Sequence, residues 1–508
     1  MPVKIALMRD ATSGQQNRHD AKADDFFHVK GLFQKTICHT IVTKPQPVCN
    51  FILAGCLQQR NSTCKNQMKN TCKTVVAAAI ATAAFAGNSQ AQSSDALINK
   101  LVDKGVLTVK EANDLREETD KDFNSAYSVK SGMPDWVNSL KFNGDLRGRY
   151  EAITVEAPNI SDRNRFRYRM RFGTVAVLKD DFEVGFRLTS SDPASGGTGG
   201  DPISGNSTFS SNGSKKFVYI EQAYGKWSPL HTDGWLGNVI IGKMENPFVT
   251  SDLMFDNDYT PEGAAATISY TLKDMHTFKV IAGAFSLNEI SADANDPYYF
   301  GGQFRVDSKW SPKFQTSAGI AFYSIESAYQ LTTASIPNQN SGNTRRADGS
   351  LVNGYRPVVV DASATYSLDS FPLYKGLFPI RAFGDYENNS DAPSRQNTGY
   401  SAGIGFGKSG KRGTWDLTYR YKHLESDAWF EELVDSDTGA YYPVAPIGGS
   451  SGYRAGTNLK GHMVRGTYSP FDSFTLGVTY FMMELIDKPA STVDTQAGRL
   501  QVDAMWKF

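Results

Sequence analysis

The chain has 508 residues, and its 53 basic and 53 acidic side chains give a formal charge of zero. This balance argues against a nucleic-acid partner, which needs a basic surface. No apolar run reaches the roughly 20 residues that a membrane-spanning helix needs. Aromatic residues still make up 12% of the chain, and glycine contributes 45 residues. Such a profile is typical of a transmembrane β-barrel, in which only alternate strand residues meet lipid.

The N-terminal region differs from the rest in composition. Residues 1–67 show no sustained hydrophobic period, and all five cysteines of the chain lie before residue 73, at Cys38, Cys49, Cys56, Cys64 and Cys72. The segment Leu53–Cys56 resembles a lipoprotein box, but the apolar stretch before it is shorter than the 7–15 residues or so that export requires. We expect residues 1–67 to be a non-native extension and translation to start at Met68.

Residues 68–91 have the three parts of a signal peptide. Lys69 and Lys73 provide a positive start, an apolar segment covers residues 74–86, and small residues precede a cleavage site between Ala91 and Gln92. The alternative is a buried alanine-rich helix. The signal peptide predicts export, and its removal leaves a net acidic mature chain without cysteine.

Residues 92–135 are expected to form a periplasmic helical hairpin and linker. Apolar residues recur near helical spacing from Ala96 to Leu101, and Gly105 is placed to end the first helix. The segment Thr108–Glu111 has the capping-box pattern that opens a second helix. The expected role of this hairpin is a spacer or a plug-side appendage, and binding to the cell wall is the alternative.

From residue 136 to the C-terminus the pattern changes to strict alternation. Arginines occupy every second position from Arg165 to Arg171, and apolar residues occupy the positions between them; the last segment, 498–508, alternates in the same way. Successive side chains of a strand point to opposite faces of the sheet. A soluble sandwich would produce the same local pattern, so strand number and loop lengths must decide.

The alternation recurs in about 16 segments, an even number as bacterial outer-membrane barrels require. The predicted strands cover 139–154, 164–178, 181–190, 216–228, 236–246, 262–273, 275–287, 298–310, 313–325, 357–368, 378–388, 398–408, 413–424, 459–469, 473–485 and 498–508. Short turns alternate with long loops, the longest at 191–215, 247–261, 326–356 and 425–458. We therefore predict an all-β transmembrane fold, a closed antiparallel barrel over residues 136–508, whose lumen is too wide for side chains to fill.

The polar side chains at alternate strand positions are the candidate pore-lining residues. They are Arg147, Arg149, Arg165, Arg167, Arg169, Arg171, Arg305 and Arg420. One interpretation is an anion-attracting stripe along the lumen. The other is a wall neutralised by Asp145 and Glu151 on the adjacent strand, because opposite charges on neighbouring strands attract each other. Both interpretations stay open.

The connection at 242–263 is the most distinctive one because it is acidic. Its carboxylates at Asp252, Asp256, Asp258 and Glu262 are the candidates for a constriction loop that folds into the lumen and faces the arginines. The alternative is an external loop whose acids bind divalent cations or are simply solvated. No EF-hand spacing is present, and we expect no metal site.

An enzyme is not expected. The mature chain has His231, His276, His423 and His462, none of which lies in a nucleophile-elbow or metal-ligand motif. We expect no catalytic residue and no cofactor.

Several of these motifs resemble the putative porin family of Gram-negative outer membranes. They include Lys104–Thr108 with Glu111, Gly144–Arg147, the arginine-rich second strand, the block from Gly242 to Gly263 and the terminal Phe508. The resemblance implies an outer-membrane diffusion channel and does not supply a substrate. It also implies that Trp506 and Phe508 form the signal read by the barrel-assembly machinery.

The expected function is a water-filled channel for passive diffusion of small hydrophilic solutes or ions. Its expected partners are outer-membrane lipid, the barrel-assembly machinery and its solutes, with a homotrimer expected only from the general behaviour of large porins. The alternative is a barrel whose long loops, 326–356 and 425–458, bind an external partner without channel activity.

Overall fold

The computed structural model describes residues 133–157, 160–194, 199–489 and 494–508. The predicted N-terminal extension, the signal peptide with its cleavage site at Ala91 and Gln92, and almost all of the predicted helical hairpin and linker lie outside the described residues. Among the helical segments that are described, none is long and apolar enough to cross a membrane.

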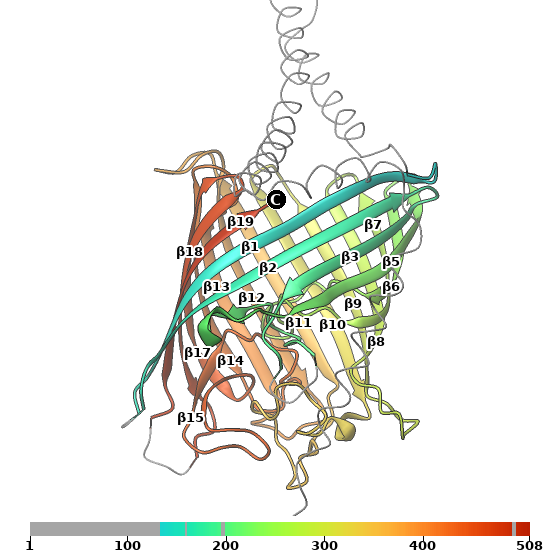
Figure 1. Ribbon diagram of the computed structural model, residues 1–508. Helices are drawn as coiled ribbons and strands as arrows, with labels where there is room; N and C mark the ends of the chain where they lie inside the picture. Colours follow the sequence, from blue (N-terminus) through green and yellow to red (C-terminus); the bar gives the residue numbers. More distant parts are fainter. Residues whose placement is uncertain (1–132, 158–159, 195–198, 490–493) are drawn as a thin grey trace, which may run out of the picture. The chain divides into compact units, whose positions relative to one another are not determined.

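Within the described ranges, sixteen antiparallel strands form one closed sheet (Figure 1). They are β1 (Val137–Val155), β2 (Arg163–Leu178), β3 (Phe182–Ser190), β5 (Val218–Thr232), β6 (Trp235–Lys243), β7 (Glu262–Leu272), β8 (His276–Ser286), β9 (Tyr298–Lys309), β10 (Phe314–Glu326), β11 (Pro357–Leu368), β12 (Phe378–Asn389), β13 (Thr398–Gly407), β14 (Thr414–Leu424), β17 (Leu459–Phe471), β18 (Phe474–Leu485) and β19 (Ala497–Lys507). Each strand pairs with its neighbour in this order, and β1 pairs with both β2 and β19, which closes the ring. The predicted strand number and closed barrel are confirmed.

The two faces of the ring carry opposite chemistry. On β2, Phe166 is 58% exposed on the outer face, whereas Arg167 is 8% exposed on the inner face. The same alternation puts Val478 and Tyr480 of β18 outside. Closure leaves no unpaired sheet edge, which is the only solution that a hydrocarbon environment allows. The predicted parity of the strands therefore corresponds to an apolar outside and a polar inside.

The connections differ at the two ends of the barrel. Tight turns such as residues 179–181, 233–234 and 472–473 join the strands at the end where the chain terminates, and the long loops lie at the opposite end (Figure 1). The long loops contain three further short strands that alternation did not predict, β4 (Ser207–Thr208), β15 (Gly439–Tyr442) and β16 (Gly452–Ala455). β15 and β16 pair only with each other in a hairpin.

The long loops pack into the barrel and form a hydrophobic core there. Loop 244–261 contributes Leu253 and Phe255, and loop 425–458 contributes Trp429, all of them at most 2% exposed. The wall contributes Tyr299 of β9 to the same cluster, and its ring lies 6.0 Å from that of Phe255. Part of the lumen is thus filled by loop side chains rather than by water.

Candidate functional site

Loop 244–261 is anchored first to the β9 wall. The backbone N–H of Val249 donates to the side-chain oxygen of Gln303 at 2.9 Å, and the Gln303 amide donates back to the Val249 carbonyl at 2.8 Å. Two residues later, the hydroxyl of Ser251 donates to the Asp385 carboxylate on β12 at 2.6 Å. These bonds hold the loop against β9 and β12, beyond its own flanking strands, β6 and β7.

Asp252 brings the loop to β14. Its carboxylate forms an ion pair with Arg420, and its backbone carbonyl accepts a hydrogen bond at 3.0 Å from the ammonium of Lys422. Arg420 and Asp252 are 13% and 19% exposed as side chains. Asp252 and Arg420, two of the predicted site residues, therefore meet inside the barrel.

Asp258 brings the same loop to β2, on another part of the wall. Its carboxylate lies 3.0 Å from Arg169 and 2.9 Å from Arg171. Burial by itself raises the pKa of Asp258, but the nearby guanidinium groups outweigh it and lower this pKa to about 2. The acidic loop therefore contacts the arginines of β2 directly.

Asp256, two residues earlier, has the opposite electrostatic environment. Its carboxylate accepts backbone N–H bonds at 2.7 Å from Asp258 and from Ser436 of loop 425–458. Burial raises the pKa of Asp256 well above its ordinary value, and the negative charges of Asp258 and Asp435 raise it further. Asp256 thus connects two long loops instead of facing the arginines.

Glu262 lies apart from the other three acidic candidates. It begins β7, its side chain is 65% exposed, and it pairs with Lys243 at 2.9 Å. The geometry therefore groups Asp252, Asp256 and Asp258 on the inward loop and leaves Glu262 at the strand end.

The arginines of β1 and β2 are mostly paired with carboxylates. Arg165 forms an ion pair with Glu151, Arg169 lies 2.8 Å from Asp145, and Arg171 lies 2.7 Å from Glu221. Arg167 lies 3.8 Å from Glu151, which is a weaker contact. Arg147 donates to the side-chain oxygen of Asn206 at 2.8 Å. This wall carries many charges, and most of them are neutralised locally.

Two residues that the sequence did not single out complete the wall. Arg499 of β19 lies 2.5 Å from Glu151 and 3.0 Å from Asp437. Asp437, in loop 425–458, also lies 3.1 Å from Arg149. Burial raises the pKa of Asp437, but Arg149 and Arg499 outweigh this effect and lower it. The polar parity of the last strand marked Arg499 as inward-facing, whereas no periodic signal marked Asp437.

Arg305 belongs to a different stretch of wall. Its guanidinium lies 2.8 Å from Asp361 on β11 and donates to Ser317 on β10 at 2.7 Å. A bond at 3.3 Å to the Val249 carbonyl also links it to the inward loop.

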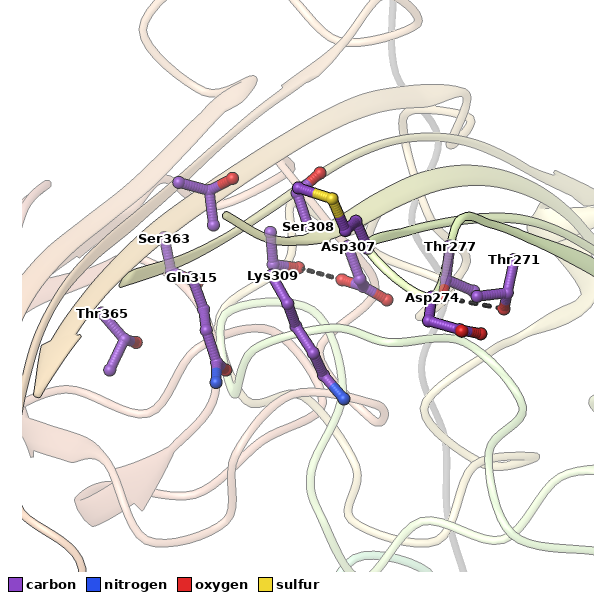
Figure 2. A pocket seen from close by; sticks show the side chains of 12 residues that line it. Thr271, Asp274, Thr277, Asp307, Ser308, Lys309, Gln315, Ser363 and Thr365 are labelled. Atoms are coloured by element: carbon purple, nitrogen blue, oxygen red, sulfur yellow. Dashed lines mark hydrogen bonds between the residues drawn. The ribbon is translucent and has the colours of Figure 1, made fainter. Parts of the chain in front are cut away.

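Two cavities lie inside the barrel between the inward loop and the end with the short turns. The larger, of about 840 Å³, extends from Val249–Asp252 of the loop to Gly407–Ser409 at the start of a turn. The other, of about 560 Å³, is lined by polar side chains that include Asp307, Lys309 and Thr277 (Figure 2). Both are lined by Gln315 and Thr365, so the two cavities are adjacent.

The aromatic residues at the chain end lie on the outer rim of the barrel. The Trp506 ring packs 4.8 Å from that of Phe474, and the Phe508 side chain is 60% exposed. The backbone of Phe508 exchanges two hydrogen bonds with Gly144 of β1, at 2.9 and 3.1 Å. Over the part of the chain that the structure describes, no cluster of His, Cys, Asp and Glu could hold a metal ion.

Comparison with known proteins supports the family resemblance. Residues 157–354 match the model of the family described as putative porin. This segment includes the arginine-rich β2 and the acidic loop, whereas Gly144–Arg147 and Phe508 lie outside it. No curated protein matches the sequence.

Solved porins match the chain at low similarity. OprB of Pseudomonas putida is 12% identical, with 73% of this chain and 94% of that chain covered and a TM-score of 0.46. OmpF of Salmonella typhi, in complex with daunomycin, is 12% identical, with 73% and 97% covered and a TM-score of 0.41. A mutant Rhodopseudomonas blastica porin is 9% identical, with 73% and 100% covered and a TM-score of 0.36. The strand pairing of the chain itself, rather than these likenesses, establishes the fold.

Proposed function

We propose that this chain is an outer-membrane porin through which small hydrophilic solutes or ions diffuse passively. The match to the putative porin family and the closed barrel support a channel of the porin type. The observation that carries the proposal is the polar lumen: adjacent cavities of about 840 and 560 Å³ lie inside a ring whose outer face is apolar. Side chains alone cannot fill a ring of about 16 strands.

In this proposal the inward loop narrows the channel. Asp252 and Asp258 attach the loop to two different parts of the wall, at Arg420 and at Arg169 with Arg171. Charged groups around a constriction set the ion selectivity of a pore. The remaining candidate pore-lining residues are Arg147, Arg149, Arg165, Arg167 and Arg305. The pairing of most of them with carboxylates favours a wall of mixed charge over a purely cationic stripe.

The location follows from the same proposal. The exposed aromatic and aliphatic side chains of the outer face would contact outer-membrane lipid, and the signal peptide ending at Ala91 would direct export. Trp506 and Phe508 would be read by the barrel-assembly machinery. A homotrimer is part of the proposal only by analogy with large porins.

Liposome swelling tests this function with neutral solutes. Vesicles that contain the purified barrel should swell in arabinose faster than in raffinose, since a narrowed channel passes smaller solutes more quickly. Barrels with the heat-modifiable gel mobility of folded protein that admit neither sugar would contradict the porin function. That result would favour the alternative, in which loops 326–356 and 425–458 bind an external partner without channel activity.

A further inference from the structure

One side of the larger cavity holds two guanidinium groups that are weakly paired or, within the described residues, unpaired with a carboxylate. Arg381 of β12 is exposed to this cavity, and within the described ranges it makes no ion pair within 4.0 Å and no hydrogen bond. Arg465 of β17 lies 3.9 Å from Asp416, near the limit for an ion pair, and is 52% exposed as a side chain. Both contrast with the arginines of β1 and β2, most of which are paired closely. Arginine carries five N–H donors, so these two have donors free for a solute.

Arg381 and Arg465 lie on one row of the sheet. Arg381 is opposite Gly405, Gly405 is opposite Thr418, and Thr418 is opposite Arg465 in the strand register. Three strand spacings separate the ends of this row, roughly 14 Å along the wall. The residues between the arginines are Gly405 and Thr418, whose short side chains leave this part of the wall open to the cavity.

An aromatic ring stands next to this row. Phe383 lies on β12 two residues after Arg381, and the guanidinium carbons of Arg381 and Arg420 lie 5.1 and 5.2 Å from the centre of its ring. The ring rests over Gly403, where an added Cβ would come within 2.5 Å of it. Glycine at position 403 therefore makes room for the ring. The ring in turn holds the Arg381 guanidinium by a cation–π contact that leaves its N–H donors available.

Each carboxylate that lines the same cavity has at least one polar contact. Asp252 pairs with Arg420, Asp361 pairs with Arg305 at 2.8 Å, and Asp385 accepts hydrogen bonds from the hydroxyls of Ser251 and Ser401. Asp416 accepts a backbone N–H bond from Ser409 at 3.3 Å. Within the described residues, Arg381 thus makes no ion pair with any carboxylate of this cavity.

We propose that this row is a binding subsite for small organic anions that carry a carboxylate. The planar guanidinium fork of Arg381 matches a carboxylate in two-point hydrogen bonding, and the neighbouring Phe383 ring offers an apolar surface to the organic part of the solute. Arg465, at the other end of the row, supplies a second cation. The volume of about 840 Å³ lies within the range of pockets that enclose small molecules.

This inference deepens the proposed porin function and rests on it for its physiological meaning, but binding is measurable without conduction. The experiment is isothermal titration of sodium benzoate into the purified, folded barrel in detergent. Wild-type protein should bind benzoate saturably, and Arg381→Gln should weaken this binding at least tenfold. Phe383→Leu should weaken benzoate binding more than acetate binding, because only benzoate has a ring to pack.

Controls separate a specific subsite from general attraction of anions. Lys226→Gln removes a cation on β5, across the ring from β13, and should leave benzoate affinity unchanged. Benzyl alcohol, which lacks the carboxylate, should show no saturable binding. If Arg381→Gln fails to fold, Arg381→Lys keeps the charge without the fork and should bind benzoate several-fold more weakly than wild type.

Three outcomes would overturn the subsite: no saturable benzoate binding by folded wild type, equal affinity in the Arg381 variants, or inorganic phosphate binding as tightly as benzoate. The two proposals fail separately. A barrel that conducts ions but does not bind benzoate refutes the subsite and leaves the porin intact. A barrel that binds benzoate but admits no solute refutes the porin function and leaves the subsite.

Discussion

The carboxylate of Asp258 lies 3.0 Å from the guanidinium of Arg169, although 89 residues separate the two in the chain. Their side chains are 15% and 9% exposed, so the pair is largely shielded from water. Because Asp252 of the same loop pairs with Arg420 of β14, ion pairs hold the loop against two separate parts of the wall, in addition to its hydrogen bonds to β9 and β12. A loop held in this way keeps one position in the lumen.

The first prediction concerns this fastening. Asp258→Asn removes the charge that faces Arg169 and Arg171, and breaking one side of a shielded pair costs about 3 kcal/mol or more. The loop should detach from β2, and single-channel recordings should show larger and more frequent current fluctuations than wild type. Glu262→Gln is the matched control, because Glu262 is exposed at the strand end, and it should behave as wild type. Steady currents in the Asp258 variant would contradict the role of this pair.

The second prediction is the pH dependence of the same loop. The pKa of Asp258 is lowered to about 2 in the folded protein, below the value of about 3.9 for a free aspartate. Its stabilisation is therefore complete above about pH 4 and is lost as the pH falls from there toward 2. Current fluctuations of wild type should increase over this interval, whereas Asp258→Asn should show them at neutral pH already.

Asp256 supplies an internal contrast for the pH experiment. Its pKa is raised, so it retains its proton to higher pH than a free aspartate does. Asp256→Asn keeps an oxygen that can accept the same backbone bonds, and it should leave the acid response unchanged because, in the described part of the chain, Asp256 makes no ion pair with the arginines. An acid response that disappears in this variant would assign the effect to Asp256 instead of Asp258.

The third prediction concerns the packing of loops 327–356 and 425–458 against each other. Arg345 and Glu431 lie 2.6 Å apart, and both side chains are fully buried. Glu431→Gln leaves the Arg345 charge without its counter-ion, which costs about 3–5 kcal/mol. Trypsin should then cut these loops in barrels that still show heat-modifiable mobility.

The control for this loop pair is Arg356→Gln, since Arg356 is 59% exposed as a side chain. It should remain as protease-resistant as wild type. Resistant loops in the Glu431 variant would show that the hydrophobic cluster around Trp429 holds them without the ion pair.

The fourth prediction concerns closure at the last residue. A Cβ at Gly144 would collide with the Phe508 ring and with the Arg171 carbonyl oxygen. Gly144→Ala and deletion of Phe508 should therefore both reduce the fraction of chains that assemble, measured as heat-modifiable protein in the outer membrane. Gly148→Ala lies in the same strand with no atom near the added Cβ, and it should assemble normally. Normal assembly of the Gly144 variant would show that closure of the barrel does not depend on the close contact between Gly144 and Phe508.

The fifth prediction concerns selectivity. Arg167 and Arg169 are both inward-facing, and their replacement by glutamate changes the charge of the wall beside the loop by four units. In a potassium chloride gradient, the reversal potential should shift toward cation preference, because fixed lumenal charge attracts the opposite ion. An unchanged reversal potential would remove these residues from the permeation path.

The number of strands and the face on which each side chain lies were predictable, because successive side chains of a strand point to opposite faces of the sheet. The interior of the barrel was not, because its loops have no period. Nothing in the sequence distinguished Trp429 and Phe255 from other loop residues, yet their ring centres lie 5.7 Å apart in the barrel interior. The sequence suggested only by charge that the acidic loop would face the arginines of β2. Charge could not indicate that Asp252 contacts Arg420 or that Asp256 contacts another loop. Arg381 matters because it makes no ion pair within the described residues, and this could be recognised only once its neighbours in the fold were known.

The most direct test of the central claim is single-channel recording of the purified barrel in a planar lipid bilayer. We expect discrete, reproducible conductance steps, because solutes should cross through the lumen past the inward loop. Complete electrical silence from protein that is shown to be folded and inserted would contradict the account of this chain as a channel.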